Sequence, residues 1–585
     1  MKYPGPLLIS MLLLFGKITT GQSILSNDYS TQPWYWSVSV KGGKSNPDSR
    51  AWLWIPPSCK KIKAVILAQN NMEECSILEN KNFRQTLSDL GFAEIWASPP
   101  FDHSFRFTEG AGDVFNKMMN DLADSSGYTE LKYTPVIGIG HSAAASWPYY
   151  FAAWNPGRTL ACISVSGQWP YFRHPSFAPD IWSKDQNIDF IPSLETMGEY
   201  EAADTWSAEG LKERKDHPFI PLSMLACPAE GHFAASQKKI DYIALYIRKV
   251  AQYRLPDYDP LNGPPLLKKI DPTRSGWLMD KWRAGQDPSS PSAPVGKYKG
   301  HPTQAFWFFD KEMVRATEKY ESSYRHQKTP LLGYVQQGQV AQQHNTHLQV
   351  SLRPLTEKDG ISFSLKGAFL DTVPGESPRP ASWTGLPAGS KVSHPDDAAA
   401  ISIHRVSGPF EKINDTLFRL ALDKSTYQTP HSYTFTFVAI YPGNETWKPA
   451  VQQAEMVLPA VNTEGAEQHI SFPPVPDQEE NAAPIQLAAT SDAGLPVSYY
   501  ILEGPAEIKG NSLHLTQLPP RTRFPVKVTV VAWQYGRSTA PKIRTATCVP
   551  RSFFIIQKDH LYEFYQSYNH LPALRRQPSH FFTVR

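Results

Sequence analysis

The residues with the clearest chemical pattern are the small ones around Ser142. The segment 136–147 begins with an apolar run, continues as Gly-x-Ser-x-Ala over Gly140–Ala144, and ends in residues that can start a helix. Small residues two positions before and after the serine are needed where a strand turns sharply into a helix, because larger side chains would collide. Such a nucleophile elbow pushes the hydroxyl outward at the C-terminal edge of a sheet, where open α/β sheets bind ligands. We therefore interpret Ser142 as a nucleophile.

Two other interpretations of such a pattern are weaker. The pattern recurs at Gly536–Ala540, but that copy meets Pro541 where a helix would have to begin, so we interpret it as a surface turn. The segment Gly138-x-Gly140-x-x-Ala143 also matches a dinucleotide-binding fingerprint, which needs an acidic residue about 20 positions further on. The next apolar run ends instead in Val165–Gln168, which contains no carboxylate and disfavours a nucleotide site.

A serine hydroxyl is a poor nucleophile unless a base removes its proton and an acid orients that base. The base candidate is His232, which follows the apolar run Leu222–Cys227 in a Gly-His pair. The acid candidates follow the run Ile191–Met197, and they are Glu199, Glu201 and Asp204. A loop can present any of three neighbouring carboxylates, so these residues by themselves leave the acid open.

The chain order of serine, acid and histidine resembles that of the α/β-hydrolase superfamily, over about residues 50 to 256. The resemblance places Glu201 in the position of the family's acid, with glutamate in place of the commoner aspartate, and His232 in the position of its base. It also implies two backbone donors for an oxyanion: the N–H of Ala143, and one from the loop after the third strand, at Asn71 or Met72. That loop lacks the His-Gly-Gly-Gly pattern of many esterases.

Aromatic side chains are dense near the expected site and suggest a stacking surface for a sugar ring or an aromatic acyl group. Trp147, Trp169 and Tyr171 are the substrate-binding candidates; the other aromatic residues are Phe101, Phe105, Tyr149, Tyr150 and Phe172. Packing in a core or a lid is the alternative for each of them. The chain has no metal-ligand spacing of histidines and no CxxC or HExxH motif, so we predict no metal site and no cofactor.

The elements that must position these residues alternate along the first part of the chain. Continuous apolar runs separated by helical patterns predict a mainly parallel sheet with helices on both faces, the α/β class. The predicted strands are Ala51–Pro56, Ala64–Ala68, Ala93–Ala97, Pro135–Ile139, Ala161–Val165, Leu194–Met197 and Leu222–Cys227. The predicted helices include Asn82–Leu90, Val114–Leu122 and Lys239–Tyr253.

Changes in composition divide the chain into domains. We predict an α/β domain at residues 22–256, a Pro/Gly-rich linker with one short helix at 257–332, and a β-rich domain at 333–475. The short alternating strands of residues 483–549 resemble a bacterial immunoglobulin-like module, and residues 550–585 are predicted to be a C-terminal tail. We therefore expect β-sandwich-type domains after the α/β domain.

The N-terminus predicts export. Residues 1–21 combine Lys2, a short apolar run at 7–15 and a polar end, the pattern of a cleavable secretory signal peptide, without a lipobox cysteine. No later apolar run is long enough to span a bilayer. The 58 basic and 55 acidic residues leave a net charge of +3, which gives no electrostatic basis for nucleic-acid binding. We expect a secreted or periplasmic protein.

Together these features predict a secreted serine hydrolase, a carboxylesterase that removes acetyl or aromatic acyl groups from a polysaccharide through an acyl-enzyme. The glycan part of this prediction is an analogy, drawn from the predicted secretion, the appended β domains and the aromatic residues near the site. The competing hypothesis is a catalytically inactive α/β-hydrolase fold that binds a glycan or a surface. The sequence does not indicate the oligomeric state.

Overall fold

The computed structural model describes residues 32–41, 49–101, 106–171, 187–233, 236–258, 263–341, 349–377, 379–426 and 431–557. The predicted signal peptide, residues 558–585 of the predicted tail, and the aromatic candidates Phe105 and Phe172 lie outside these ranges. No helix within them is both long and apolar enough to cross a lipid bilayer.

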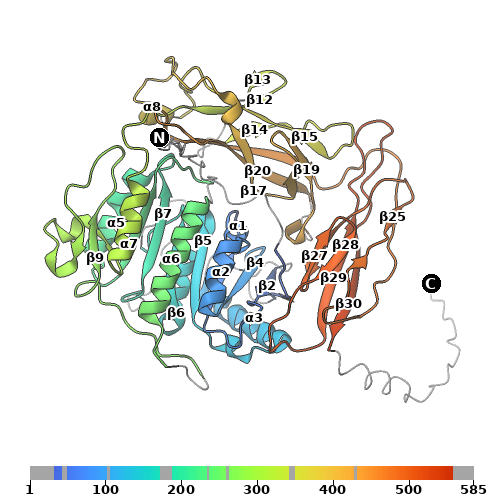
Figure 1. Ribbon diagram of the computed structural model, residues 1–585, viewed down its shortest axis with the longest axis horizontal. Coiled ribbons are helices and arrows are strands. Elements are labelled where there is room, and N and C mark those ends of the chain that lie inside the picture. The colour runs from blue at the N-terminus through green and yellow to red at the C-terminus, as the bar shows by residue number, and fades with distance from the viewer. Residues whose placement is uncertain are drawn as a thin grey trace, which may run out of the picture.

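Eight strands form one large sheet in the order β1-β2-β4-β3-β5-β6-β7-β8 (Figure 1). They are β1 (Trp36–Ser39), β2 (Arg50–Trp54), β3 (Ala64–Gln69), β4 (Phe92–Ser98), β5 (Val136–His141), β6 (Thr159–Val165), β7 (Ser193–Gly198) and β8 (Leu222–Cys227). The β1-β2 and β2-β4 pairs are antiparallel, and all the others are parallel. From β3 to β8 every strand residue is buried, which explains the continuous apolar runs and confirms the predicted mainly parallel sheet.

Helices cover both faces of this sheet. They are α1 (Glu74–Leu78), α2 (Lys81–Leu90), α3 (Ala111–Ser126), α4 (Trp147–Trp154), α5 (Ala203–Asp216) and α6 (Gln237–Arg254). Helices α2 and α6 lie side by side on one face (Figure 1), while Phe115 of α3 packs against Phe151 of α4 on the other, with ring centroids 4.9 Å apart. Asn80 caps α2 by accepting two backbone N–H groups of its first turn, and α2 ends at Gly91, whose φ of 71° favours glycine.

The segment predicted as a linker, residues 257–332, is instead packed against the edge strand β8. It contains β9 (Trp277–Asp280), β10 (Ala293–Pro294), β11 (Ala305–Phe308) and α7 (Lys311–Glu321). Ser223 of β8 donates a hydrogen bond to the carbonyl of Trp307 at 2.6 Å, and the Glu321 carboxylate accepts the N–H of Ala226 at 3.0 Å. A sheet edge has unpaired backbone groups, so this cover satisfies and protects it.

A β-rich unit follows and lies across the C-terminal edge of the large sheet (Figure 1). Its elements are β12 (Leu332–Gln336), β13 (Gln339–Val340), β14 (Val350–Leu352), β15 (Ser362–Ser364), β16 (Lys366–Phe369), α8 (Arg379–Thr384), β17 (Ser402–Ser407), β18 (Phe410–Lys412), β19 (Leu417–Leu420), β20 (Ser432–Tyr441) and β21 (Ala450–Pro459). They form three small sheets. Between the β15-β19-β18 sheet and the β14-β21-β20-β17 sheet, five phenylalanine rings pack together, from Phe363, Phe410, Phe418, Phe435 and Phe437.

The last unit consists of three small β-sheets, two of which enclose a core of their own. Its strands are β22 (Ile470–Ser471), β23 (Gln478–Glu479), β24 (Ile485–Gln486), β25 (Thr490–Ser491), β26 (Ser498–Glu503), β27 (Ala506–Lys509), β28 (Ser512–Leu515), β29 (Val526–Trp533) and β30 (Val549–Ile556). Leu513 of one main sheet and Val528 and Phe553 of the other share this core. The unit therefore starts before the predicted residue 483, and β30 extends it into the predicted tail. Its immunoglobulin-like character stays a prediction.

Candidate active site

Ser142 lies at the sharp turn between β5 and α4. Its φ of 54° is in the left-handed region, which is rare for a residue other than glycine and marks local backbone strain. A Cβ atom placed on Gly140 would lie 2.0 Å from the carbonyl oxygen of Ala144, and one on Gly138 would lie 2.8 Å from Pro148. The small residues of the motif are thus required by close backbone approach, as expected for a nucleophile elbow.

The structure brings together Ser142, His232 and Glu201. Nε2 of His232 lies 2.9 Å from Oγ of Ser142, and Nδ1 of the same ring lies 2.5 Å from Oε1 of Glu201. The three residues follow β5, β8 and β7, whose C-terminal ends meet at one edge of the sheet. The His232 side chain is 5% exposed and that of Glu201 is 10% exposed, so the contact between these two side chains is shielded from solvent.

The other two acid candidates have different surroundings. Glu199 pairs with Lys448 at 2.6 Å through Oε1, and its Oε2 accepts the N–H of Ala229 at 2.8 Å. Asp204 is exposed in the first turn of α5. Of the three carboxylates, Glu201 therefore has the position of a triad acid.

A second histidine, His141, supports the first. Its Nε2 donates a hydrogen bond to the backbone carbonyl of His232 at 3.0 Å, and the two ring centroids lie 4.9 Å apart. His141 is fully buried. A carbonyl only accepts hydrogen bonds, so Nε2 of His141 must carry a proton. The sequence pattern does not point to His141, because this contact joins two separate strand ends.

The loop expected to supply the second oxyanion donor is held by a carboxylate that the sequence did not point to. Oε2 of Glu74 accepts the N–H groups of Asn71 at 2.9 Å and Met72 at 2.8 Å, and its Oε1 accepts the N–H of His141 at 2.7 Å. Both predicted N–H donors are thus engaged by Glu74 in this structure and are not free to bind an oxyanion. The side-chain amide of Asn71 donates to the carbonyl of His141 at 3.2 Å, next to Ser142. Ala143, the predicted first donor, is exposed directly after Ser142.

Two adjacent buried carboxyl groups underlie the site. Burial raises the pKa of Glu73 to about 8 and that of Glu74 to about 7. The backbone N–H groups that Glu74 binds limit its shift, whereas neither carboxylate oxygen of Glu73 has a hydrogen-bond partner among the described residues. Glu73 lies 3.7 Å from His141, so it places a titratable group next to the residue that precedes Ser142.

The aromatic candidates for substrate binding do not lie at the site. Trp147 and Trp169 are fully buried, and their indole N–H groups donate to the carbonyls of Ile139 and Trp206. Tyr171 is partly buried and stacks on His217 at the far end of α5, one helix length from the acid loop. The expectation that these three side chains line the substrate site is therefore wrong for the tryptophans and unsupported for Tyr171.

The second Gly-x-Ser-x-Ala copy has none of this context. Ser538 is exposed in a turn, as predicted, and it is followed by Pro541 with no helix. Within the described part of the chain, no group of three or more histidine, cysteine, aspartate or glutamate residues is arranged to hold a metal ion.

Comparison with known proteins finds similarity only among solved structures. No protein-family model matches the chain. No curated protein matches it either. A dienelactone hydrolase from Anabaena variabilis is 14% identical, with 38% of this chain and 98% of that chain covered and a TM-score of 0.27. FphF, a fluorophosphonate-binding serine hydrolase of Staphylococcus aureus, is 12% identical. The match covers 38% of this chain and 99% of that chain, with a TM-score of 0.27. Est1E from Butyrivibrio proteoclasticus is 14% identical. The match covers 37% of this chain and 96% of that chain, with a TM-score of 0.25.

Proposed function

We propose that this protein is a serine hydrolase that cleaves carboxylic esters through an acyl-enzyme. The observation that carries the proposal is the continuous hydrogen-bonded chain from Ser142 through His232 to Glu201, with contacts of 2.9 and 2.5 Å. A nucleophile, a base within hydrogen-bond reach and an acid that orients the base are the components that such catalysis requires.

In this mechanism His232 removes the proton from Oγ of Ser142 as the oxygen attacks the ester carbonyl. Glu201 holds the imidazole in the productive tautomer and stabilises the imidazolium that forms. The backbone N–H of Ala143 is the first donor to the tetrahedral oxyanion. The imidazolium then protonates the leaving alcohol, and water activated by His232 hydrolyses the acyl-enzyme.

The substrate that we propose is an ester substituent, acetyl or aromatic acyl, on an extracellular polysaccharide. The predicted signal peptide and the two β units that follow the α/β domain support this choice. The aromatic surface expected from Trp147 and Trp169 does not, since both are core residues. The acyl group must therefore be recognised by other residues.

One observation favours a second candidate function, a non-catalytic binding protein. Glu74 occupies the N–H groups of both Asn71 and Met72, so the second oxyanion donor is not formed in this structure. A site of this kind would bind an ester or a glycan without turning it over.

Labelling with a fluorescent organophosphonate separates the two functions. We expect the wild-type protein to be labelled at Ser142 alone, as mapped by mass spectrometry, and to hydrolyse p-nitrophenyl acetate. Ser142→Ala should abolish both signals. Ser538→Ala, at the second copy of the motif, should change neither. A wild-type protein that is neither labelled nor active, and that binds glycans equally well with Ser142→Ala, would identify the non-catalytic function.

A further inference from the structure

We infer that the segment Lys448–Gln453, at the start of β21 in the β-rich unit, positions the two loops that carry Glu201 and His232. We call this segment the β21 clamp, the loop 198–202 the acid loop, and the loop 228–233 the histidine loop. The β-rich unit is then a part of the catalytic apparatus and not only an appended module. The inference rests on the proposed hydrolase function.

The clamp holds the acid loop at the two residues that precede Glu201. The ammonium group of Lys448 pairs with Glu199 at 2.6 Å, and the two side chains are only 10% and 12% exposed. The hydroxyl of Tyr200 donates to the carbonyl of Pro449 at 2.8 Å. The Lys448 ammonium also lies 5.3 Å from the centre of the Tyr200 ring. Two consecutive residues are thus fixed immediately before the acid.

The clamp holds the histidine loop at the residue that follows His232. Oε1 of Gln453, a buried side chain, accepts the N–H of Phe233 at 2.9 Å. The approach is close, since a Cβ atom on Gly231 would lie 3.2 Å from Cγ2 of Val451. The residues on both sides of His232 therefore face β21.

Glu199 joins the two loops to each other and to the clamp. Its Oε1 binds Lys448, and its Oε2 accepts the N–H of Ala229 in the histidine loop. The N–H of Tyr200 also donates to the carbonyl of Glu230 at 2.9 Å. Removal of the Lys448 charge leaves a nearly buried carboxylate unpaired at the point where the loops meet, and such a group moves or takes up a proton.

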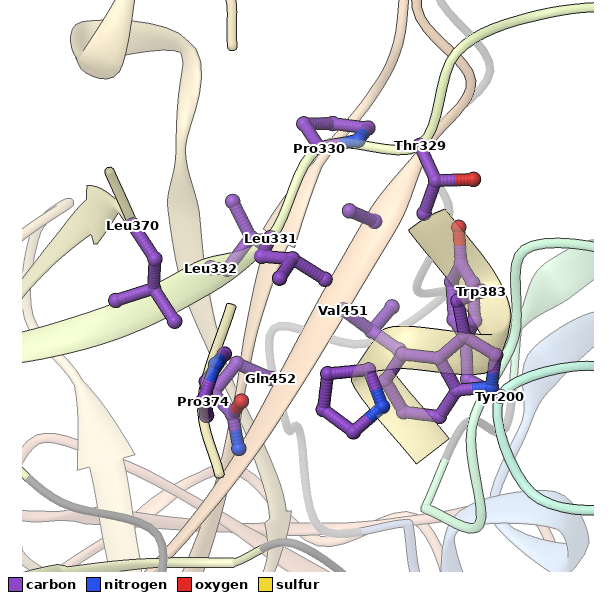
Figure 2. Close-up of a pocket in the computed structure, with 12 residues that line it drawn as sticks. Tyr200, Thr329, Pro330, Leu331, Leu332, Leu370, Pro374, Trp383, Val451 and Gln452 are labelled. Atoms are coloured by element: carbon purple, nitrogen blue, oxygen red, sulfur yellow. The ribbon is translucent and has the colours of Figure 1, made fainter. Parts of the chain in front are cut away.

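Apolar side chains pack around these polar contacts on both sides of the catalytic loops. Phe233 of the histidine loop is buried in a cluster with Val406, Val438 and Ile440 of the β-rich unit, and Met72 and Val451 pack against it. On the other side of the acid loop, the rings of Tyr200 and Trp383 lie 4.9 Å apart, and Figure 2 shows these two residues with Val451 and Gln452 around one pocket. The catalytic loops thus lie against the β-rich unit on both sides.

The physical consequence concerns orientation. The Glu201 and Ser142 contacts of His232 depend on loop positions, and a displacement of about 1 Å can reduce turnover about 100-fold. The clamp fixes those positions through four backbone or side-chain contacts that do not touch the reacting atoms. Lys448, Pro449 and Gln453 therefore act through Glu201 and His232 as positioning residues.

The test is Lys448→Met in the full chain, compared with Lys424→Met. Lys424 belongs to the same β-rich unit and also forms a buried ion pair with the α/β domain, through Glu79, but it contacts neither catalytic loop. The Lys424–Glu79 pair is more deeply buried than the Lys448–Glu199 pair. Lys424→Met should therefore lower the melting temperature at least as much as Lys448→Met does. We expect Lys448→Met to lower kcat for p-nitrophenyl acetate by about 10- to 100-fold with KM little changed. Lys424→Met should keep kcat within about threefold, and Lys448→Arg should restore most of the loss by retaining the charge.

A second pair of variants decides the question if Lys448→Met does not fold. Tyr200→Phe removes the hydrogen bond to Pro449 without leaving a buried charge. Tyr535→Phe is its control, because the Tyr535 hydroxyl donates to the carbonyl of Pro459 at 2.7 Å, at the other end of β21. We expect a fall in kcat only for Tyr200→Phe.

Each result has one meaning. Equal kcat in the clamp variants and their controls, with an active wild-type protein, overturns the positioning role and leaves the hydrolase function intact. A wild-type protein that is neither labelled by organophosphonate nor active overturns the proposed function, and the positioning role falls with it.

Discussion

Three carboxylates close together in the chain, those of Glu199, Glu201 and Asp204, have different partners in the structure. Glu201 bonds to the imidazole of His232, Glu199 pairs with Lys448, and Asp204 is exposed at the start of α5. In the proposed mechanism, the carboxylate that bonds to Nδ1 stabilises the imidazolium that forms during proton transfer. The chemical role of each residue therefore follows from its position in the loop and not from its side-chain type.

A first prediction concerns the acid. Glu201→Gln should lower kcat for a p-nitrophenyl ester about 100- to 10,000-fold, because an amide neither stabilises the imidazolium nor favours the productive tautomer. Asp204→Asn is the matched control and should leave kcat unchanged. The opposite ranking of the two variants would make Asp204 the acid.

A second prediction concerns Glu73 and pH. Its pKa is raised by burial from an ordinary 4.5 to about 8, so the folded state binds this proton more tightly than the unfolded state does. The resulting stability is present at low pH and is lost as the pH rises from about 4.5 through about 8. Glu73→Gln should therefore raise the melting temperature relative to wild type, by an amount that grows between pH 5 and pH 9.

Calorimetry at several pH values checks this prediction. The control is Glu376→Gln, the same substitution at an exposed glutamate of the β-rich unit, which should change the melting temperature little. A Glu73→Gln difference that is constant from pH 5 to pH 9 would show that Glu73 does not titrate in this range.

At the scale of elements, the turn from β5 to α4 decides whether Ser142 can be presented at all. The turn brings Gly140 so close to Ala144 that no Cβ atom fits between them, since the gap would be 2.0 Å. The strand, the turn and the helix must therefore shift together if Gly140 is replaced.

A third prediction follows for this turn. Gly140→Ala should lower the melting temperature and reduce organophosphonate labelling of Ser142 at least about 100-fold, because the hydroxyl would be displaced from His232. Gly157→Ala is the control, since a Cβ atom there meets nothing within 4 Å. Normal labelling of Gly140→Ala would mean that the turn is less constrained than its geometry indicates.

At the scale of the whole molecule, the two β units contact the α/β domain at different places. The β-rich unit lies against the loops at the C-terminal edge of the sheet, where the serine is. The last unit contacts the segment that precedes β5, where Arg521 pairs with Glu130 at 2.9 Å and lies 4.9 Å from the centre of the Tyr128 ring. Under the proposed function, we expect the first contact to affect catalysis and the second to affect stability.

A fourth prediction separates these roles. Arg521→Ala should lower the free energy of unfolding by about 1–3 kcal/mol, because Glu130, a buried carboxylate, loses its charged partner and keeps the N–H of Ile62. The variant should keep wild-type kcat/KM at a temperature where it is fully folded. Arg544→Ala removes an exposed ion pair within the last unit and should leave the melting temperature unchanged. A fall in kcat/KM for folded Arg521→Ala would show that the last unit also reaches the catalytic edge.

The sequence by itself determined the parts of this protein that depend on local pattern. Continuous apolar runs predicted the parallel strands from β3 to β8, because both faces of such strands are buried. The small residues around Ser142 predicted the tight turn, because their spacing reflects a steric requirement within one short segment. The Gly-His pair pointed to His232 because it follows the apolar run that forms β8, at a strand end.

Only the tertiary structure decided what depends on contacts between distant segments. It brought Glu201 rather than Glu199 against His232, placed Trp147 and Trp169 in the core, and made the supposed linker 257–332 a cover for β8. It also placed Lys448, which is 249 residues further along the chain than Glu199, beside the acid loop. Loop direction and packing partners are set by the sum of many weak interactions across the whole fold, and no local spacing of residue types records that sum.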